Sequence, residues 1–511
     1  MVFLQKFEQK YLDIFCQVWY CHKIQHRMRC PCALKTAISN APENFLLMLK
    51  LRLLPYRFAS ARTALILEIH SEVRPGFGSF RNYNYVGCWG ALALVPFSER
   101  SGQIMKTQNR WIILVVSFVA NLIIGSAYAW SVFQPRLIEM FEFTTPQASI
   151  AFTLSLGLVP FAMILGGKIQ SKIGARFTVL LGGIVFGAGI ALAGLTTHNI
   201  ATLYLTYGTL GGIGIGLVYG CTIPNSVKWF PDKRGLAGGI IAGGFGGGAI
   251  IFAPLFQSTI ESVGVLRTFT IYGIIFGIVI ILASLLITVP PADYKPAGWT
   301  PPSSAANNAS ANLNVTGMLK TARFYILWIM YVLACVTGLM IIAHAGHVAE
   351  ARIGVTPALA ATAVLLLGVA NTVGRVFWGA VSDKIGRYQT LILMYAMTAG
   401  MLILLTFAPS YVLFVISIMG IGLCFGGFLG VFPSITAENF GTANLGMNYG
   451  VLFIAFGIAA FVGPRLAASL FESSGAHDLA FVIATIMSAV ALVITVLLLI
   501  SSKKQVASKK A

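Results

Sequence analysis

The stretch that decides the fold class reads Leu365-Leu-Leu-Gly-Val-Ala-Asn-Thr-Val-Gly-Arg-Val-Phe-Trp-Gly-Ala-Val-Ser-Asp-Lys-Ile-Gly-Arg387. Its apolar part is long enough to belong to a membrane-spanning helix. Arg375 lies inside it, and no acidic residue follows until Asp383, two turns later. A guanidinium keeps its charge and is costly to hold in hydrocarbon. We therefore predict that Arg375 is an anion receptor.

A second interpretation of Arg375 is structural. Lys384 and Arg387 follow it closely, so the long side chain could instead extend its charged head to the membrane surface. We favour the receptor, because charged residues within spanning segments are functional by default.

Composition sets the broad class. Of the 511 residues, 57% are hydrophobic and 10% are charged, against about 25% charged residues in soluble domains. The mean hydropathy is +0.82. These values predict a polytopic membrane protein.

Residues 1–104 differ from the remainder. They contain no apolar run of spanning length, and they hold a group of cysteines and histidines: Cys16, Cys21, His22, His26, Cys30 and Cys32. This spacing matches no usual zinc pattern, and we expect no metal and no cofactor. Met105 opens a short polar segment and then the first apolar span. We expect residues 1–104 to be a basic N-terminal extension that precedes the native start at Met105.

Twelve apolar segments of spanning length follow. They cover 111–133, 147–166, 177–195, 200–224, 236–257, 268–289, 324–347, 357–381, 389–408, 411–434, 446–470 and 478–501. We predict an all-α membrane protein with two six-helix bundles, 105–289 and 323–501. A cytoplasmic linker, 290–322, rich in Pro, Ser, Ala and Asn, joins them, and 502–511 form a basic cytoplasmic tail.

The distribution of Lys and Arg orients the chain. If both termini are cytoplasmic, seventeen Lys and Arg residues from Lys106 onward fall on the cytoplasmic side and four on the outer side. This bias predicts cytoplasmic termini in a multi-pass protein of the cell (inner or plasma) membrane. The net charge of +19 therefore needs no nucleic-acid partner.

The two halves carry an internal repeat. The segment Gly167–Arg176 after the second span is similar to Gly379–Arg387 after the eighth. Phe245-Gly246 and Phe456-Gly457 also occupy matching places in the fifth and eleventh spans. Paired halves are typical of transporters that bind substrate at the interface between halves.

The loop Gly379-x-x-x-Asp383-Lys384-x-Gly386-Arg387 resembles the loop signature of the major facilitator superfamily. Its glycines permit a tight turn, and Asp383 can pair with basic groups at helix ends. We predict that these five residues form a gating loop. The first-half copy has Ser171 where the acid is expected, which weakens a salt bridge there.

Two further stretches, Gly125–Phe133 and Lys228–Gly239, are similar to the oxalate/formate antiporter family, a relative of the monocarboxylate transporters. The resemblance covers residues 105–501. It implies the major facilitator fold and a secondary active carrier of small carboxylates by alternating access.

Two departures from the relatives bear on the substrate. Oxalate carriers of the family have a Lys in the eleventh span, where Phe456 aligns, and proton-coupled monocarboxylate transporters have an Asp where Asn371 stands. One fixed cation suits one carboxylate, so we expect lactate, pyruvate or formate. An oxalate:formate-type dicarboxylate antiporter remains the alternative, and antiport, symport and uniport all remain open.

Other candidate binding residues are aromatic. Tyr128, Trp130 and Tyr219 could wall an organic anion, as the family resemblance implies, although such residues also anchor helices at membrane interfaces. His344 and His347 share a helix face and could be linked to protons, or could line a wet outer rim.

Other function classes fit less well. A membrane anion sensor would need a signalling domain that this sequence does not show. The spans contain no nucleophile–base pair, so we predict no enzyme. The expected partners are small carboxylate anions and the lipid bilayer, and we expect the protein to function as a monomer.

Overall fold

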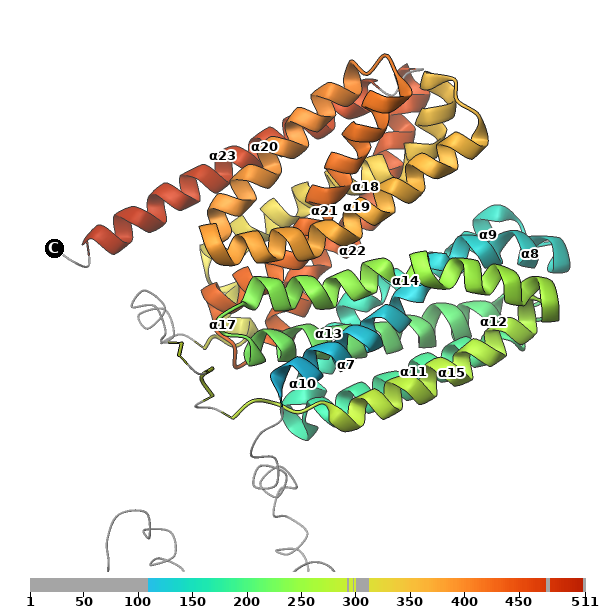
Figure 1. The fold of residues 1–511 in the computed structure, drawn as a ribbon, viewed down its shortest axis with the longest axis horizontal. Coiled ribbons are helices and arrows are strands. Elements are labelled where there is room, and N and C mark those ends of the chain that lie inside the picture. The colour runs from blue at the N-terminus through green and yellow to red at the C-terminus, as the bar shows by residue number, and fades with distance from the viewer. Residues whose placement is uncertain (1–108, 292–293, 297, 300–311, 475–477, 509–511) are drawn as a thin grey trace, which may run out of the picture. The chain divides into compact units, whose positions relative to one another are not determined.

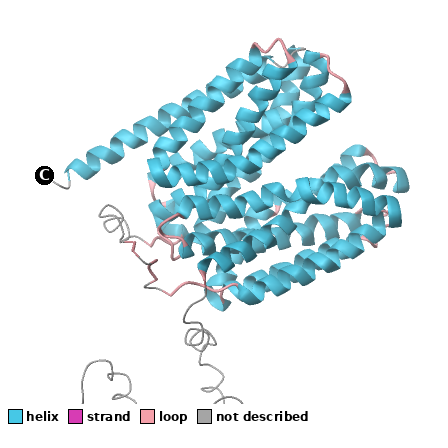
Figure 2. Cartoon of the chain, viewed as in Figure 1, coloured by secondary structure: helices cyan, strands magenta, loops and turns pink. Residues whose placement is uncertain are grey.

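The computed structural model describes residues 109–291, 294–296, 298–299, 312–474 and 478–508. The cysteine- and histidine-rich extension and Met105 lie outside the described residues. Within them the chain forms helices and connecting loops, with no strand (Figure 2). Twelve helices in this part of the chain are long and apolar enough to cross a membrane, which confirms the predicted fold class.

The first half contains six spans. The first span consists of α7 (Arg110–Ile124), the 3₁₀ segment η2 (Gly125–Ala129) and α8 (Trp130–Phe141), and the second consists of α9 (Thr145–Gly157) and α10 (Val159–Ile173). The third span is α11 (Ala175–Ala193), and the fourth consists of α12 (Ala201–Leu203), the π-helical segment η3 (Tyr204–Gly211) and α13 (Gly212–Trp229). The fifth and sixth spans are α14 (Arg234–Val263) and α15 (Val265–Leu286).

The second half begins after the linker with a short helix, α17 (Val315–Leu319). The six spans of this half are α18 (Ala322–Ile353), α19 (Pro357–Ile385), α20 (Arg387–Thr406), α21 (Tyr411–Phe440), α22 (Leu445–Ser474) and α23 (Asp478–Ser508). Figure 1 shows α17 at the end of the bundle where the linker runs. We call this end the linker face and the opposite end the far face.

Local sequence signals end and begin these helices. Gly174 and Gly386 separate consecutive helices with φ values of +88° and +97°, a backbone region that favours glycine. The two residues occupy equivalent places in the sequence repeat, so both halves turn in the same way there. Thr144 starts α9 with a capping box to Gln147, which satisfies free backbone N–H groups at the helix start.

Glycines allow the helices to pack closely. A methyl group on Gly214 would lie 2.5 Å from the backbone nitrogen of Phe186 on α11, and one on Gly244 would lie 2.8 Å from the carbonyl oxygen of Phe118 on α7. The glycine-rich segments 208–216 and 243–248 are therefore packing surfaces, as expected for spanning helices. Large apolar side chains such as Leu205, Leu282 and Leu497 are more than half exposed and form a surface suited to lipid.

The two halves meet tightly near the linker face. A methyl group on Gly167 of α10 would lie 2.6 Å from the backbone nitrogen of Met447 on α22, and one on Gly379 of α19 would lie 3.0 Å from the carbonyl carbon of Gly235 on α14. Toward the far face, α10 and α22 separate around a cavity of about 330 Å³. The structure therefore has its linker face closed.

Candidate anion site between the two halves

Arg375 lies on α19 with its side chain directed against α14 of the other half. The residue is only 2% exposed. Its Nη1 donates to the carbonyl oxygen of Ala242 at 2.7 Å, and its Nε donates to Oδ1 of Asn371 at 3.2 Å. The guanidinium is therefore buried between the halves rather than placed at the membrane surface.

Two glycines of α14 make room for this arginine. A methyl group on Gly246 would lie 2.8 Å from both Cζ and Nε of Arg375, and one on Gly239 would lie 3.1 Å from the carbonyl carbon of Arg375. A side chain at Gly246 would therefore force the guanidinium to shift. The glycine-rich sequence of α14 thus places a cation of one half against the backbone of the other.

Tyrosines from both halves surround the guanidinium. Tyr128 and Tyr219 come from the first half and Tyr449 comes from the second, where Tyr331 lies beside it. Arg375 interacts electrostatically with Tyr128, Tyr219 and Tyr449. Tyr219, Tyr331 and Tyr449 are at most 1% exposed. Because they carry polar hydroxyl groups, these side chains give a buried apolar region several hydrogen-bond donors.

Two of these hydroxyl groups, those of Tyr331 and Tyr449, are buried and make no hydrogen bond of standard geometry to any residue that the structure describes. The two side chains lie close enough to interact with one another. A buried hydroxyl without a partner costs free energy, so such groups mark positions that can accept a polar ligand. The sequence prediction missed both tyrosines.

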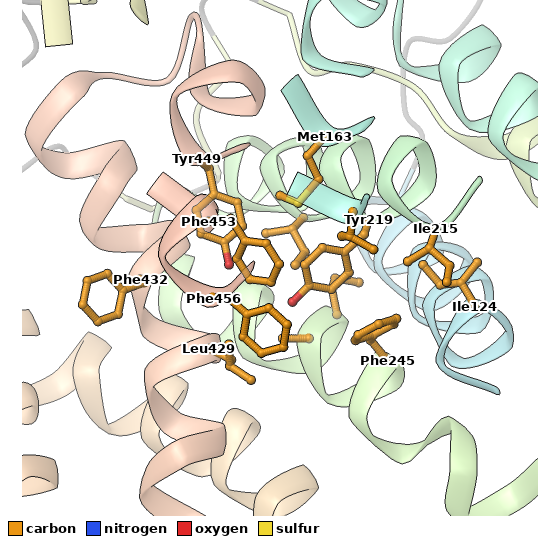
Figure 3. Close-up of a cluster of buried hydrophobic side chains, with 14 of the residues drawn as sticks. Ile124, Met163, Ile215, Tyr219, Phe245, Leu429, Phe432, Tyr449, Phe453 and Phe456 are labelled. Carbon is orange, nitrogen blue, oxygen red and sulfur yellow. The ribbon is translucent and has the colours of Figure 1, made fainter. Parts of the chain in front are cut away.

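Phenylalanines complete the wall of the site. Phe245 packs against Tyr128 and Tyr219, with ring centroids 5.0 and 4.9 Å away. Phe453 packs against Tyr219 and Tyr449 and stacks on Phe456, at 5.7, 5.6 and 4.9 Å. Figure 3 shows the hydroxyl ends of Tyr219 and Tyr449 directed toward the Phe456 side of this cluster. The predicted residues Tyr128, Tyr219 and Phe456 therefore belong to one aromatic shell.

Trp130 and the histidines occupy different surroundings. Trp130 packs on Tyr207 with ring centroids 4.5 Å apart, inside the first half. His344 lies 3.0 Å from the carbonyl oxygen of Pro464 and lines a small apolar cavity with Phe414 and Phe481. The substrate role of Trp130 and the proton-linked roles of His344 and His347 stay predictions.

The predicted gating loop bridges the halves at the linker face. Both carboxylate oxygens of Asp383 accept hydrogen bonds from backbone N–H groups in the first turn of α14, those of Gly235 and Leu236, each at 2.8 Å. Arg387 pairs with Asp383 at 2.8 Å and with Glu438 of α21 at 2.8 Å. A carboxylate at a helix N-terminus is favourable, so Asp383 ties the second half to the start of α14.

The other members of the loop contribute unequally. Gly379 packs against Gly235 across the interface, and Gly386 has the positive φ that the turn requires. Lys384 is exposed. In the first half, the Ser171 hydroxyl donates to the carbonyl oxygen of Lys168 in its own helix. We call the contact of Asp383 with the start of α14 the latch. Ser171, at the matching position of the first half, bonds within its own helix instead.

Comparison with known proteins identifies the family to which this architecture belongs. The family model of the Major Facilitator Superfamily matches residues 110–349 and 327–511. The chain belongs to the major facilitator superfamily. The oxalate:formate antiporter of Oxalobacter formigenes is 32% identical over 386 residues, which cover 75% of this chain and 90% of that protein. An uncharacterised transporter of the same superfamily, YhjX of Escherichia coli, is 31% identical and covers 69% of this chain and 86% of that protein.

Further relatives and solved structures are similar to this chain at lower identity. The apicoplast pyruvate carrier 1 of Toxoplasma gondii is 27% identical, over 66% of this chain and 69% of that protein. Among solved structures, the transporter FucP in its outward conformation has a TM-score of 0.59 at 16% identity, covering 76% of this chain and 99% of that chain. The human organic anion transporter MFSD10 has a TM-score of 0.61 at 14% identity, covering 76% and 100%. The chain is thus a multi-pass membrane transporter, and its relatives are transporters rather than enzymes.

The latch formed by Asp383 should stabilise the closed linker face. We expect Asp383→Asn to raise the population with an open linker face about tenfold, because it removes a charge from the α14 N-terminus and from the pair with Arg387. Distances between spin labels placed on the two halves would report the populations. Lys384→Gln, an exposed neighbour on the same turn, is the control. Equal behaviour of the two variants would contradict the assignment of the latch to Asp383.

Proposed function

We propose that this protein is a secondary active transporter of small monocarboxylates, with Arg375 as the receptor for the carboxylate. The supporting observation is the state of the guanidinium. It is buried between the halves, and among the described side chains no carboxylate forms an ion pair with it. An uncompensated buried charge is strongly unfavourable, and a carboxylate substrate would compensate it with two parallel hydrogen bonds.

The remaining shell favours a single negative charge. Phe456 is 5% exposed and stacked on Phe453, in the place where a second cation would be needed for a dicarboxylate. The other polar groups of the shell include the neutral hydroxyls of Tyr128, Tyr219, Tyr331 and Tyr449. They can donate to a hydroxyl or keto oxygen without adding a charge. This chemistry fits lactate and pyruvate well, and the smaller formate in part.

Dicarboxylate exchange is the second candidate function. One of the relatives is an oxalate:formate antiporter, and the neighbouring buried hydroxyl groups of Tyr331 and Tyr449 could together receive a second carboxylate. Hydroxyl donors would have to replace a full counter-charge in a buried site, which makes this the less favourable arrangement.

Transport in this proposal alternates between closure at the linker face and closure at the far face. The bias of Lys and Arg toward the linker side supports cytoplasmic termini in the plasma membrane, so the described conformation would face outward. The Asn371 amide, bonded to Arg375, cannot carry a proton. Any proton coupling would therefore use another group, for which His344 and His347 remain the candidates. Both halves that form the candidate site belong to the same chain, which supports a functional monomer.

A competition assay tests the substrate class. Vesicles containing the protein would take up labelled lactate while unlabelled lactate, pyruvate, formate or oxalate is added outside at neutral pH. We expect pyruvate to compete well and oxalate to compete at least about tenfold less well, because its second charge would be desolvated without compensation. Equal competition by oxalate and lactate would overturn the one-charge proposal and favour the dicarboxylate alternative.

A further inference from the structure

An apolar cavity lies at the edge of the interface between the halves, and Arg375 is not among its lining residues. The cavity of about 330 Å³ is lined by Gly157 of α9, by Pro160 and Phe161 of α10, and by five residues of α22: Ile454, Gly457, Ile458, Phe461 and Val462. Every lining residue is apolar. Phe161 and Phe461 are 61% and 54% exposed, so the cavity opens to the hydrocarbon side of the protein.

The shape of the cavity follows from how α10 and α22 diverge. At Gly450 a methyl group would lie 3.0 Å from the backbone nitrogen of Ile164, and at Gly457 it would lie 3.3 Å from Cγ of Pro160. At Gly157 a methyl group would meet nothing within 4 Å. Packing is therefore tight at Gly450 and open at Gly157, which lies nearer the far face, and we call the cavity at this level the wedge.

A cation lies at the outer end of this wedge. Arg465 follows Phe461 by one helical turn, and its Cζ stacks 3.6 Å from the centre of the Phe461 ring. The residue is exposed, and among the described side chains no carboxylate pairs with it. From Ile454 to Arg465 the helix rises about 16 Å, close to the roughly 15 Å depth of one leaflet of hydrocarbon.

We propose that this wedge holds an acyl chain of a phospholipid from the far leaflet, with the lipid phosphate paired to Arg465. Apolar lining, opening to hydrocarbon, leaflet-length depth and a terminal cation together match this one class of ligand. Closure of the far face would bring α10 and α22 together and remove the space. The bound lipid therefore stabilises the conformation with a closed linker face, since a ligand shifts an equilibrium toward the state it binds better.

Photolabelling of the full chain in vesicles tests the site. The probe is a phosphatidylglycerol with a photoreactive group in the middle of its acyl chain, and labelled peptides are mapped by mass spectrometry. We expect labelling to concentrate on 454–462. It should fall several-fold in Gly157→Leu, which fills the wedge, and about fivefold in Arg465→Gln, which removes the phosphate partner. Gly400→Leu, at another glycine whose methyl position is open, is the matched control.

The outcomes separate the proposal from its alternatives. Labelling spread evenly over the lipid-facing helices, or unchanged in both wedge variants, would overturn the lipid site. Cross-links between two copies of the chain at this surface in place of lipid labelling would also overturn it. The experiment measures lipid labelling and not lactate transport. Its result therefore does not depend on whether the proposed transport function is correct.

Spin-label distances between the halves test the stabilising effect. Adding phosphatidylglycerol to the purified protein should increase the fraction with a closed linker face several-fold in the unmodified protein and in Gly400→Leu. Gly157→Leu should not respond. A response of Gly157→Leu equal to that of the unmodified protein would show that the lipid acts elsewhere.

Discussion

Replacing Arg375 by Gln is expected to reduce carboxylate uptake about a hundredfold or more, because a buried ion pair with the substrate would be lost. Arg375→Lys is expected to be severely impaired as well. It keeps the charge but loses the planar fork that binds a carboxylate with two hydrogen bonds. Initial uptake rates in reconstituted vesicles would measure both effects.

The control for this prediction is Arg267→Gln, which changes an exposed arginine near the start of α15. It should transport normally, and all three variants should insert into the membrane like the unmodified protein. Near-normal uptake by Arg375→Gln would show that the guanidinium serves packing between α14 and α19 rather than substrate binding.

Phe456→Lys is expected to change the preferred substrate from a monocarboxylate to a dicarboxylate. A lysine there would place a second cation in the aromatic shell that contains Phe453 and Tyr219. Charge-assisted hydrogen bonds contribute about 1.5–3 kcal/mol, so the ratio of oxalate to lactate uptake should rise roughly tenfold to a hundredfold. Uptake of both labelled anions by the same vesicle preparation gives this ratio.

Two variants separate charge from shape in this experiment. Phe456→Leu removes the stack on Phe453 without adding a charge, so it should leave the ratio of oxalate to lactate near its original value. Combining Phe456→Lys with Arg375→Gln should abolish transport of both anions. The same shift in Phe456→Leu as in Phe456→Lys would place the effect in the shape of the wall.

The fold could be predicted well because membrane-spanning helices are recognised in a sequence by the length and apolar character of their segments. The ends of the helices were harder to predict. The first span was predicted at 111–133, yet the helical segments continue to Phe141, since helices extend beyond the hydrocarbon through residues that are no longer apolar. The composition of the linker 290–322 gave no sign of a helix, but the structure has α17 there, and Asn314 caps it by accepting from the backbone N–H of Gly317.

Part of the candidate site could be predicted from the sequence. Asn371 and Arg375 are four residues apart on one helix, so their contact follows from helix geometry alone. The acceptor at Ala242 is a backbone carbonyl, which no side-chain pattern marks. Tyr331 and Tyr449 required knowledge of how α18 and α22 are rotated about their axes. Trp130 follows the 3₁₀ segment η2, whose tighter turn changes the helix face on which later residues lie.

If Arg375 is the receptor that we propose, its hydrogen bond to Ala242 links substrate binding to the contact between the halves. In the described state, the cation proposed to receive the substrate also holds the carbonyl of the opposite half, so an incoming anion competes with that carbonyl for the same N–H group. The intrinsic affinity in this state is lowered by the free energy of displacing the carbonyl. By thermodynamic reciprocity, a bound anion loosens the closed interface by the same amount. In the protein without substrate, the Ala242 carbonyl occupies the N–H group that a bound anion would use. Substrate binding would therefore weaken one of the bonds that keep the two halves together.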